Sequence, residues 1–261
     1  MAFKSIVFAI CLCLVTRFLV AAESNDQNRG ELRDRVEPKG WLYGFGLGIN
    51  GEIYKGYDRR VIPLPLIGYR GDRLLVLGPF ANYELFEAGN FDFTINIAPR
   101  FAGFDEGDSI FFTGMAKRKS SLDMGLGLVY ENDNWKFQSR AMYDILGRSD
   151  GYEVTAQVGK VFRQGPLFIE PTIGVSYMDD SMVDYYYGVR DNEANAVRPA
   201  YQGNDVLNTT LGISFATPIL FGGFTRAGIE YTWFDSGITD SPLVNDDSSL
   251  GVFIAYSKFF K

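Results

Sequence analysis

SLDMGLGLVYENDNWKFQSRAMYDILGRSDGYEVTAQVGKVFRQGPLFIEPTIGVSYM, residues 121–178, is the stretch that decides the fold. Apolar and polar residues alternate through four consecutive segments of it, and short runs of turn residues separate one segment from the next. In the first segment, Leu126 and Leu128 fall on one side while Gly125 and Gly127 fall on the other. Because side chains alternate sides only in a strand, the pattern predicts four strands, each with one apolar face and one polar face.

A water-soluble β-sandwich would also show this alternation, but two features of the segments favour a membrane barrel. Segments of ten or more residues are longer than the usual soluble strand and suit a tilted strand that crosses a bilayer. The polar faces carry charges of both signs beside many glycines, whereas the apolar faces are long and have aromatic residues at their ends. We therefore predict an all-β fold, a transmembrane antiparallel β-barrel with long extracellular loops and short periplasmic turns.

The chain has 261 residues, which predicts one domain of barrel size preceded by an export signal. Residues 1–22 combine Lys4, an apolar run and the small residues Val20, Ala21 and Ala22, which is typical of a secretory signal peptide and its cleavage site. Residues 23–40 are polar and have no periodicity, so we expect a flexible periplasmic segment there. Residues 41–261 then form the barrel.

The composition excludes several classes of function. Removal of the signal peptide leaves 23 basic against 32 acidic residues, and such an acidic chain is a poor nucleic-acid binder. Both cysteines lie in the signal peptide, and the chain contains no histidine. Ser–His and Cys–His nucleophile pairs, histidine bases and metal sites with histidine or thiolate ligands are therefore excluded. We predict that the protein is not an enzyme and holds no cofactor or metal.

The same alternation continues on both sides of the opening stretch and predicts twelve strands. Pro63 and Pro65 weaken the second strand and indicate an irregular edge or a bulge. A break at Gly78 and Pro79 gives an even number of strands between the four wide connections, as is required if all four lie outside the cell. Both termini are then periplasmic. The expected strands are residues 41–50, 60–70, 73–78, 80–87, 90–101, 121–130, 135–145, 151–162, 166–178, 206–217, 223–234 and 249–260.

Charged residues recur on the polar faces of these strands. On the lipid-facing side, a Lys or Arg at the bilayer midplane would cost roughly 2 to 4 kcal/mol, so we expect these charges inside the barrel, where opposite signs pair. A lumen of mixed sign favours a packed interior over a selective pore, and the sequence leaves both alternatives open. The expected lumen charges are Asp92, Arg100, Asp123, Lys136, Arg140, Asp144, Glu153, Glu170, Arg226 and Glu230.

Several motifs lie in the longest predicted loops and in the second strand. Residues 184–189 read DYYYGV, residues 198–201 read RPAY and residues 240–244 read DSPLV. Together with PLPLIGY at residues 63–69, these motifs resemble the MipA/OmpV family of Gram-negative outer-membrane proteins, whose name means MltA-interacting protein. The motif residues, to which the resemblance assigns no defined role, are Tyr185, Tyr186, Tyr187, Gly188, Val189, Arg198, Pro199, Tyr201, Asp240, Ser241 and Pro242.

The resemblance implies a multi-pass barrel in the lipid of the outer membrane that acts as a scaffold for murein-remodelling enzymes. The implied partners are a lytic transglycosylase and a penicillin-binding synthase, and a homodimer would be one way to enlarge a periplasmic contact surface made of small turns. Other family members imply two alternatives, a porin-like channel for small solutes and a surface adhesin that uses the extracellular loops. We expect residues 185–201 either to pack as a plain loop or to enter the barrel mouth, and Asp240 to cap a turn or the start of a helix.

Overall fold

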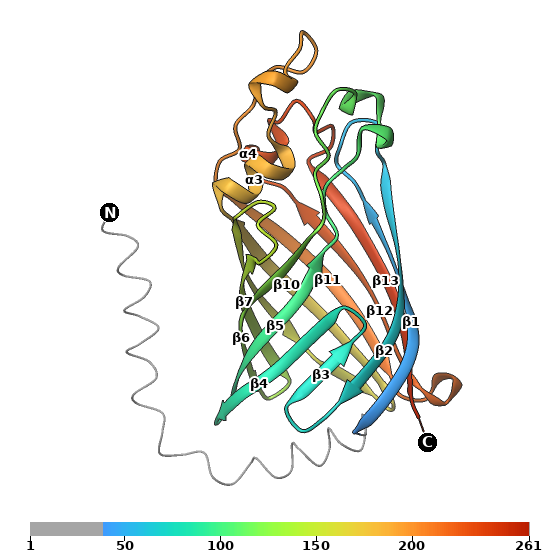
Figure 1. The fold of residues 1–261 in the computed structure, drawn as a ribbon. Helices are drawn as coiled ribbons and strands as arrows, with labels where there is room; N and C mark the ends of the chain where they lie inside the picture. The colour runs from blue at the N-terminus through green and yellow to red at the C-terminus, as the bar shows by residue number, and fades with distance from the viewer. Residues whose placement is uncertain (1–38, 261) are drawn as a thin grey trace.

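The computed structural model describes residues 39–260, which form a barrel of antiparallel strands (Figure 1). The expected signal peptide at residues 1–22 and residues 23–38 of the expected N-terminal segment lie outside the described residues. Within the remainder of that segment, Lys39 pairs with Asp72 at 2.7 Å, and Gly40 already belongs to the first strand. No helix among residues 39–260 is long and apolar enough to cross a membrane.

Thirteen strand segments lie within residues 39–260. The segments are β1 (Gly40–Gly51), β2 (Arg59–Arg70), β3 (Leu74–Leu77), β4 (Phe80–Ala88), β5 (Phe91–Arg100), β6 (Ser121–Asn132), β7 (Trp135–Asp144), β8 (Tyr152–Lys160), β9 (Phe162–Gln164), β10 (Leu167–Met178), β11 (Val206–Thr217), β12 (Phe224–Trp233) and β13 (Ser248–Phe259). β8 and β9 count as one strand, because both pair with β10 in one register, with Gly159 opposite Thr172 and Phe162 opposite Ile169. The prediction of twelve strands is therefore confirmed, although this strand extends two residues beyond the expected residues 151–162.

The strands form a closed ring in which chain neighbours pair with each other. Every pairing is antiparallel, and β1 also pairs with β13, so that Tyr43 lies opposite Lys258 and the first strand meets the last. Both ends of the barrel domain lie at the same end of the ring (Figure 1). An even number of strands with adjacent ends is the architecture of single-chain outer-membrane barrels.

The apolar faces of the strands point outward, as the alternation predicts. Trp135, Ile173 and Trp233 expose 50%, 55% and 46% of their surface, which excludes a water-soluble sandwich with these residues sealed in its core. Aromatic side chains also lie where β1 meets β2, with the Trp41 and Tyr69 rings 5.4 Å apart. Aromatic residues of this kind are typical of the membrane interfaces of a transmembrane barrel.

The two ends of the barrel differ in their connections. One end, the turn end, carries short connections, including Asp133 and Asn134, whose φ angles of 47° and 67° are typical of a type I′ hairpin turn. The other end, the loop end, carries residues 52–58, 101–120, 179–205 and 234–247, which we call the cap. The cap contains α3 (Asp180–Tyr187), α4 (Ser236–Thr239) and the single-turn helices η1 (Glu106–Asp108), η2 (Ile110–Phe112) and η3 (Asp191–Glu193). The expected wide connections are therefore present and gather at one end (Figure 1).

Candidate functional site

The cap has an apolar core of its own, built from all four of its loops. Two clusters of buried side chains make up this core and include the strand residues on which it rests. The first cluster is Ile53, Met178, Met182, Val183, Tyr186, Val206, Ile238 and Val244, and the second is Tyr54, Phe104, Phe112, Met115, Val189 and Leu243. Because each loop supplies residues to these clusters, no loop can move away from the cap without exposing buried side chains of the other loops to solvent.

The tyrosine motif belongs to α3, which has a clear reason to be helical. Asp179 precedes it as the N-cap, and its carboxylate accepts a hydrogen bond from the Met182 amide at 3.2 Å. Met182, Val183 and Tyr186 lie at helical spacing on one face and are buried in the first cluster. The aromatics thus pack within the cap and reach the rim of the barrel, where Met178 ends β10.

The family motifs, which are far apart in the sequence, meet in the cap. Ser241 Oγ donates a hydrogen bond to the Tyr187 carbonyl at 2.6 Å. Val189 and Tyr201 form an antiparallel bridge, so the chain after Gly188 folds back and runs beside its own earlier part. The motif residues therefore build the cap core and hold its loops to one another.

Asp240 does not begin a helix, and this part of the sequence prediction is wrong. α4 begins after Asp235, whose carboxylate accepts from the backbone amide two residues further on at 3.1 Å, whereas Asp240 is the last, C-capping residue. In the turn that follows, Ser241 Oγ accepts a hydrogen bond from the Leu243 amide at 3.2 Å, and Pro242 is half-buried. The turn that was expected is present, but serine caps it instead of aspartate.

A buried ion pair joins two of the cap loops. Arg118 Nη2 lies 2.6 Å from Glu193 Oε2, and their side chains are only 1% and 3% exposed. The Arg198 guanidinium, also buried, donates to the Glu193 carbonyl at 2.7 Å and to the carbonyl of Phe111, while its neighbour Pro199 is exposed. Burial alone would raise the pKa of Glu193, but hydrogen bonds from Arg118 and from backbone amides outweigh it and lower that pKa to about 2.

Arg118 was not among the residues that the sequence pointed to, and Glu193 belongs to the loop motifs that carry the family resemblance but had no predicted role. A charged residue in a long loop is usually solvated, and neither position shows a periodicity that would indicate burial. Glu193 does lie between the tyrosine motif and Arg198, within the longest loop. Only the folded cap brings it next to Arg118, which is 75 residues away along the chain.

Below the cap, three expected lumen charges form one network. Arg100 Nη2 lies 2.7 Å from Asp123 Oδ2 and 2.7 Å from Glu153 Oε2, and Ser176 Oγ donates to the other oxygen of Glu153. These residues belong to β5, β6, β8 and β10, which follow one another in the ring with β7 between β6 and β8, so the network bridges part of the barrel interior. Opposite charges therefore lie side by side at this level of the barrel.

Two further lumen carboxylates have partners. Lys136 Nζ lies 3.9 Å from Glu170 Oε1, a longer and weaker ion pair. Asp144 accepts hydrogen bonds from Ser121 Oγ and from backbone amides of residues 146, 148 and 149, so it fixes the connection that follows β7.

The remaining lumen charges are more open. Arg140 and Glu230 are exposed, and within residues 39–260 no ion pair holds either of them. Gly127, opposite Arg140, makes room for Thr94 and Asn96, since a Cβ there would lie 2.5 Å and 2.6 Å from their side-chain atoms. Nearer the turn end, the Arg226 guanidinium lies 4.9 Å from the centre of the Phe224 ring. Asp92 lies on β5 opposite Val129.

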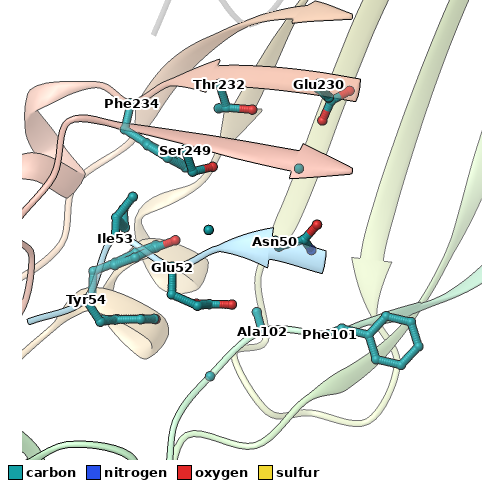
Figure 2. A pocket seen from close by; sticks show the side chains of 14 residues that line it. Asn50, Glu52, Ile53, Tyr54, Phe101, Ala102, Glu230, Thr232, Phe234 and Ser249 are labelled. Atoms are coloured by element: carbon teal, nitrogen blue, oxygen red, sulfur yellow. The ribbon is translucent and has the colours of Figure 1, made fainter. Parts of the chain in front are cut away.

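A cavity of about 200 Å³ separates the cap from the open part of the lumen (Figure 2). Asn50, Thr232 and Ser249 supply uncharged polar groups to its lining, Glu52 and Glu230 supply carboxylates, and Phe101 and Tyr187 supply aromatic rings. Figure 2 shows the side chains of Thr232 and Ser249 entering it from neighbouring strands. The arrangement suits binding of a small polar group that carries no negative charge.

Comparison with known proteins gives the family. A family model described as MltA-interacting protein MipA matches residues 43–260. The chain belongs to the MipA family. Outer membrane protein Omp26La of Vibrio anguillarum is 28% identical over 222 residues, which are 83% of this chain and 86% of that protein. Outer membrane protein OmpV of Vibrio cholerae is 27% identical with the same coverage, and MltA-interacting protein of Escherichia coli K12 is 28% identical over 77% of this chain and 83% of that protein.

Membership of the MipA family confirms the resemblance based on the loop motifs. Together with the twelve-stranded barrel, it makes this chain a multi-pass β-barrel of the outer membrane. The relatives reported above are named as outer-membrane or interacting proteins, and none of these names describes an enzyme. The location of the protein is thus better defined than its function, because one barrel architecture supports many functions.

Proposed function

We propose that this MipA-family barrel is a non-enzymatic scaffold that binds a lytic transglycosylase at its turn end. A relative named for interaction with MltA supports this partner, and a penicillin-binding synthase is the second enzyme that the scaffold would hold. The observation that carries the proposal is the cap. Its four loops pack into one body with fully buried side chains, including Phe112 and Met182, and such a body at the loop end favours a structural role over free passage along the axis.

The turn end offers a surface for such a partner. Between β11 and β12, Ile219, Leu220 and Phe221 are all exposed, and Phe221 is 86% exposed. Phe221 also has a φ of 54°, a left-handed conformation that is strained for a non-glycine residue, and its carbonyl accepts a hydrogen bond from Tyr256 Oη at 3.0 Å. Because one turn is far smaller than a stable interface, several turns or a homodimer would have to contribute.

Co-purification tests the scaffold proposal. Folded barrel reconstituted with the lytic transglycosylase should retain the enzyme, and Phe221→Ser should weaken retention several-fold. Ile110→Ser is the matched control, because Ile110 is also 86% exposed but lies in the cap at the opposite end. Failure of the correctly folded wild-type barrel to retain any murein enzyme would overturn the proposal, as would equal losses in the two variants.

A small-solute channel is the second candidate, supported by the cavity below the cap and by the exposed lumen charges Arg140 and Glu230. Planar-bilayer recording separates the two functions. Steady current through the wild-type barrel would favour the channel, and a silent barrel would favour the scaffold. The adhesin alternative stays a prediction of the sequence.

A further inference from the structure

The barrel wall is not hydrogen-bonded along its whole height between β2 and β5. β3 has only four residues and pairs with Gly68, Tyr69 and Arg70 at one end of β2, and the register of β4 on β5 reaches no further than Ile97. Above this point, within residues 39–260, no strand pairs with residues 61–66 of β2 on the side away from β1. Among the described residues, Figure 1 shows no strand between β2 and β5 above the short hairpin of β3 and β4. We call the line between residues 61–66 and residues 98–101 the seam.

Prolines occupy both edges of the seam. The Gly78 amide donates to the Ile67 carbonyl at 3.0 Å, so Ile67 directs its backbone groups toward the seam side of β2. Pro65 and Pro63 have the same parity and therefore direct their nitrogens to the same side. On the facing edge, the Leu122 carbonyl accepts from β7, so Pro99, its direct opposite, turns its own backbone groups away from β6 and into the seam. Three positions that would supply ladder donors across the seam thus have none.

This arrangement opposes both closure of the wall and addition of a strand. A partner strand would find carbonyls at Pro63 and Pro65 but no N–H groups, and proline on a free edge is a known protection against strand pairing. Unpaired backbone in hydrocarbon is costly, and membrane proteins tolerate it only where it is buried in protein or lines a water-containing cavity. We therefore interpret the seam as a break in the hydrogen-bonded wall between lumen and bilayer, and not as an edge to which another strand binds.

The side chains along the seam are apolar except for Arg100, which points into the lumen toward Asp123 and Glu153. Val61 within the seam and Ile67 just beyond it are exposed toward lipid, whereas Ile62 and Leu64 lie inside, since their Cβ atoms lie 3.7 Å and 3.5 Å from where a Cβ would be at the inward-facing glycines 48 and 46. On the facing edge the ring of Phe80 contacts that of Phe101, with centroids 6.5 Å apart.

The seam adjoins the cavity beneath the cap. Phe101 lines both, and Arg60 closes the upper end of the seam by donating to the Gly103 carbonyl and by pairing with Glu52 at 2.6 Å. The unpaired part of the wall therefore adjoins a cavity whose polar groups include Asn50 and Ser249.

We propose that the seam is a lateral route by which an uncharged single-chain amphiphile passes between the outer membrane and the cavity under the cap. The hydrocarbon chain lies between Leu64 and the rings of Phe80 and Phe101, and a hydroxyl head reaches Asn50, Thr232 and Ser249. A negatively charged head is repelled by Glu52 and Glu230, which also line the cavity, and a charged head of either sign would lose its hydration between the apolar side chains of residues 61–66. This route goes beyond the scaffold role and does not depend on it, since it involves the opposite half of the barrel from the murein partner.

Photo-cross-linking tests the route in the full chain reconstituted in phosphatidylcholine vesicles that contain a long-chain alcohol with a terminal alkyne. Benzoylphenylalanine is introduced singly as Leu64→benzoylphenylalanine in the seam, as Thr232→benzoylphenylalanine in the cavity or as Gln138→benzoylphenylalanine on β7, nearly opposite in the strand order. Labelling of the lipid-facing variant Val61→benzoylphenylalanine reports correct insertion. We expect Leu64 and Thr232 to be labelled several-fold more strongly than Gln138. Equal labelling of Leu64 and Gln138, with Val61 labelled, would overturn the proposal.

Narrowing the seam tests the direction of entry. Leu64→Trp should reduce labelling at Thr232→benzoylphenylalanine several-fold, whereas Gln138→Trp, which adds a similar bulk to the lumen away from the seam, should leave it unchanged. Unchanged labelling in Leu64→Trp, with Val61 still labelled, would mean that the alcohol arrives along the barrel axis and would overturn the lateral route. Retention of a murein enzyme is measured separately, so that failure here leaves the scaffold proposal standing.

Discussion

Two ion pairs of equal length lie in the same cap, and they differ strongly in burial. The Arg118 to Glu193 pair and the Lys117 to Asp105 pair are both 2.6 Å long, but the first is almost fully buried and both side chains of the second are about half exposed. Taking a charge out of water is expensive, so a buried pair holds a structure in place mainly because neither partner can be left alone. An exposed pair has water as an alternative partner and contributes little.

Glu193→Gln is therefore expected to loosen the cap, whereas Asp105→Asn is not. The first change leaves the Arg118 guanidinium buried and unpaired, which should cost about 3 to 5 kcal/mol of cap stability. Hydrogen exchange of backbone amides in residues 101–120 and 179–205 measures the effect. If both variants exchange as slowly as the wild type, the ion pair does not hold the cap.

The same carboxylate should make the cap acid-sensitive. The pKa of Glu193 is about 2 in the folded cap against its usual 4.5, so the carboxylate stabilises the folded state fully above pH 4.5, and this contribution is lost as the pH falls toward 2. Cap amides should therefore exchange faster, after correction for intrinsic rates, as the pH is lowered through this range. Glu193→Gln should remove most of this dependence and leave only what Asp105 contributes, and an unchanged pH profile in that variant would contradict the assignment.

Whether the position of a single residue could be predicted depended on whether the residue lies in a repeating sequence pattern. Arg100 and Glu153 lie at polar positions of period-two segments, and this spacing alone predicts that they face the lumen. Arg118 lies in a loop without periodicity, and its partner is fixed only by how two long loops fold against each other. Long loops take their conformation from tertiary contacts, which a single sequence does not reveal.

Among whole elements, the strands were predictable and the helices of the cap were not. Most of the twelve strands repeat one signal over nine or more residues, whereas α3 has eight residues and α4 has four. A local signal for α3 does exist, with Asp179 as N-cap and Met182, Val183 and Tyr186 at helical spacing. The prolines of β2 predicted an irregular edge. The irregularity is that β3 pairs with β2 only at residues 68–70.

The ring closes where the first strand, β1, pairs with the last strand, β13. At Gly44 of β1 an added Cβ would lie 1.8 Å from the Tyr256 carbonyl oxygen of β13, a clash with backbone that cannot move aside. At Gly46, two residues away on the same face, it would lie 3.5 Å from the nearest atom, the Cβ of Leu64. We expect Gly44→Ala to prevent closure and Gly46→Ala to be tolerated.

Heat-modifiable mobility on a gel separates folded from unfolded barrels and therefore tests the prediction for the two glycine variants. The folded fraction in outer-membrane preparations should fall sharply for Gly44→Ala alone. Normal assembly of Gly44→Ala would show that β1 and β13 shift apart at little cost.

The whole molecule combines a ring of strands with a cap that is folded separately but anchored on it. The first cap cluster includes Met178 and Val206, which lie at the ends of β10 and β11, so the cap rests on the barrel wall. Its loops share one core, and it should therefore open as a unit while the barrel remains closed. Access from the loop end is then decided by the cap, and access from the membrane by the seam.

Removal of one cap loop should consequently turn a silent barrel into a conducting one. Replacing residues 180–203 by a short Gly-Ser linker deletes Met182, Tyr186 and Glu193 together, which dissolves both buried clusters and leaves Arg118 without its partner. Planar-bilayer recording should then show steady current where the wild type shows none. Asp133→Asn with Asn134→Gly alters a turn at the other end, suits its type I′ conformation and should leave the barrel silent. If the loop-replaced barrel is folded by heat-modifiability and still silent, the obstruction lies deeper, where Arg100, Asp123 and Glu153 join across the lumen, and the cap is not what closes the axis.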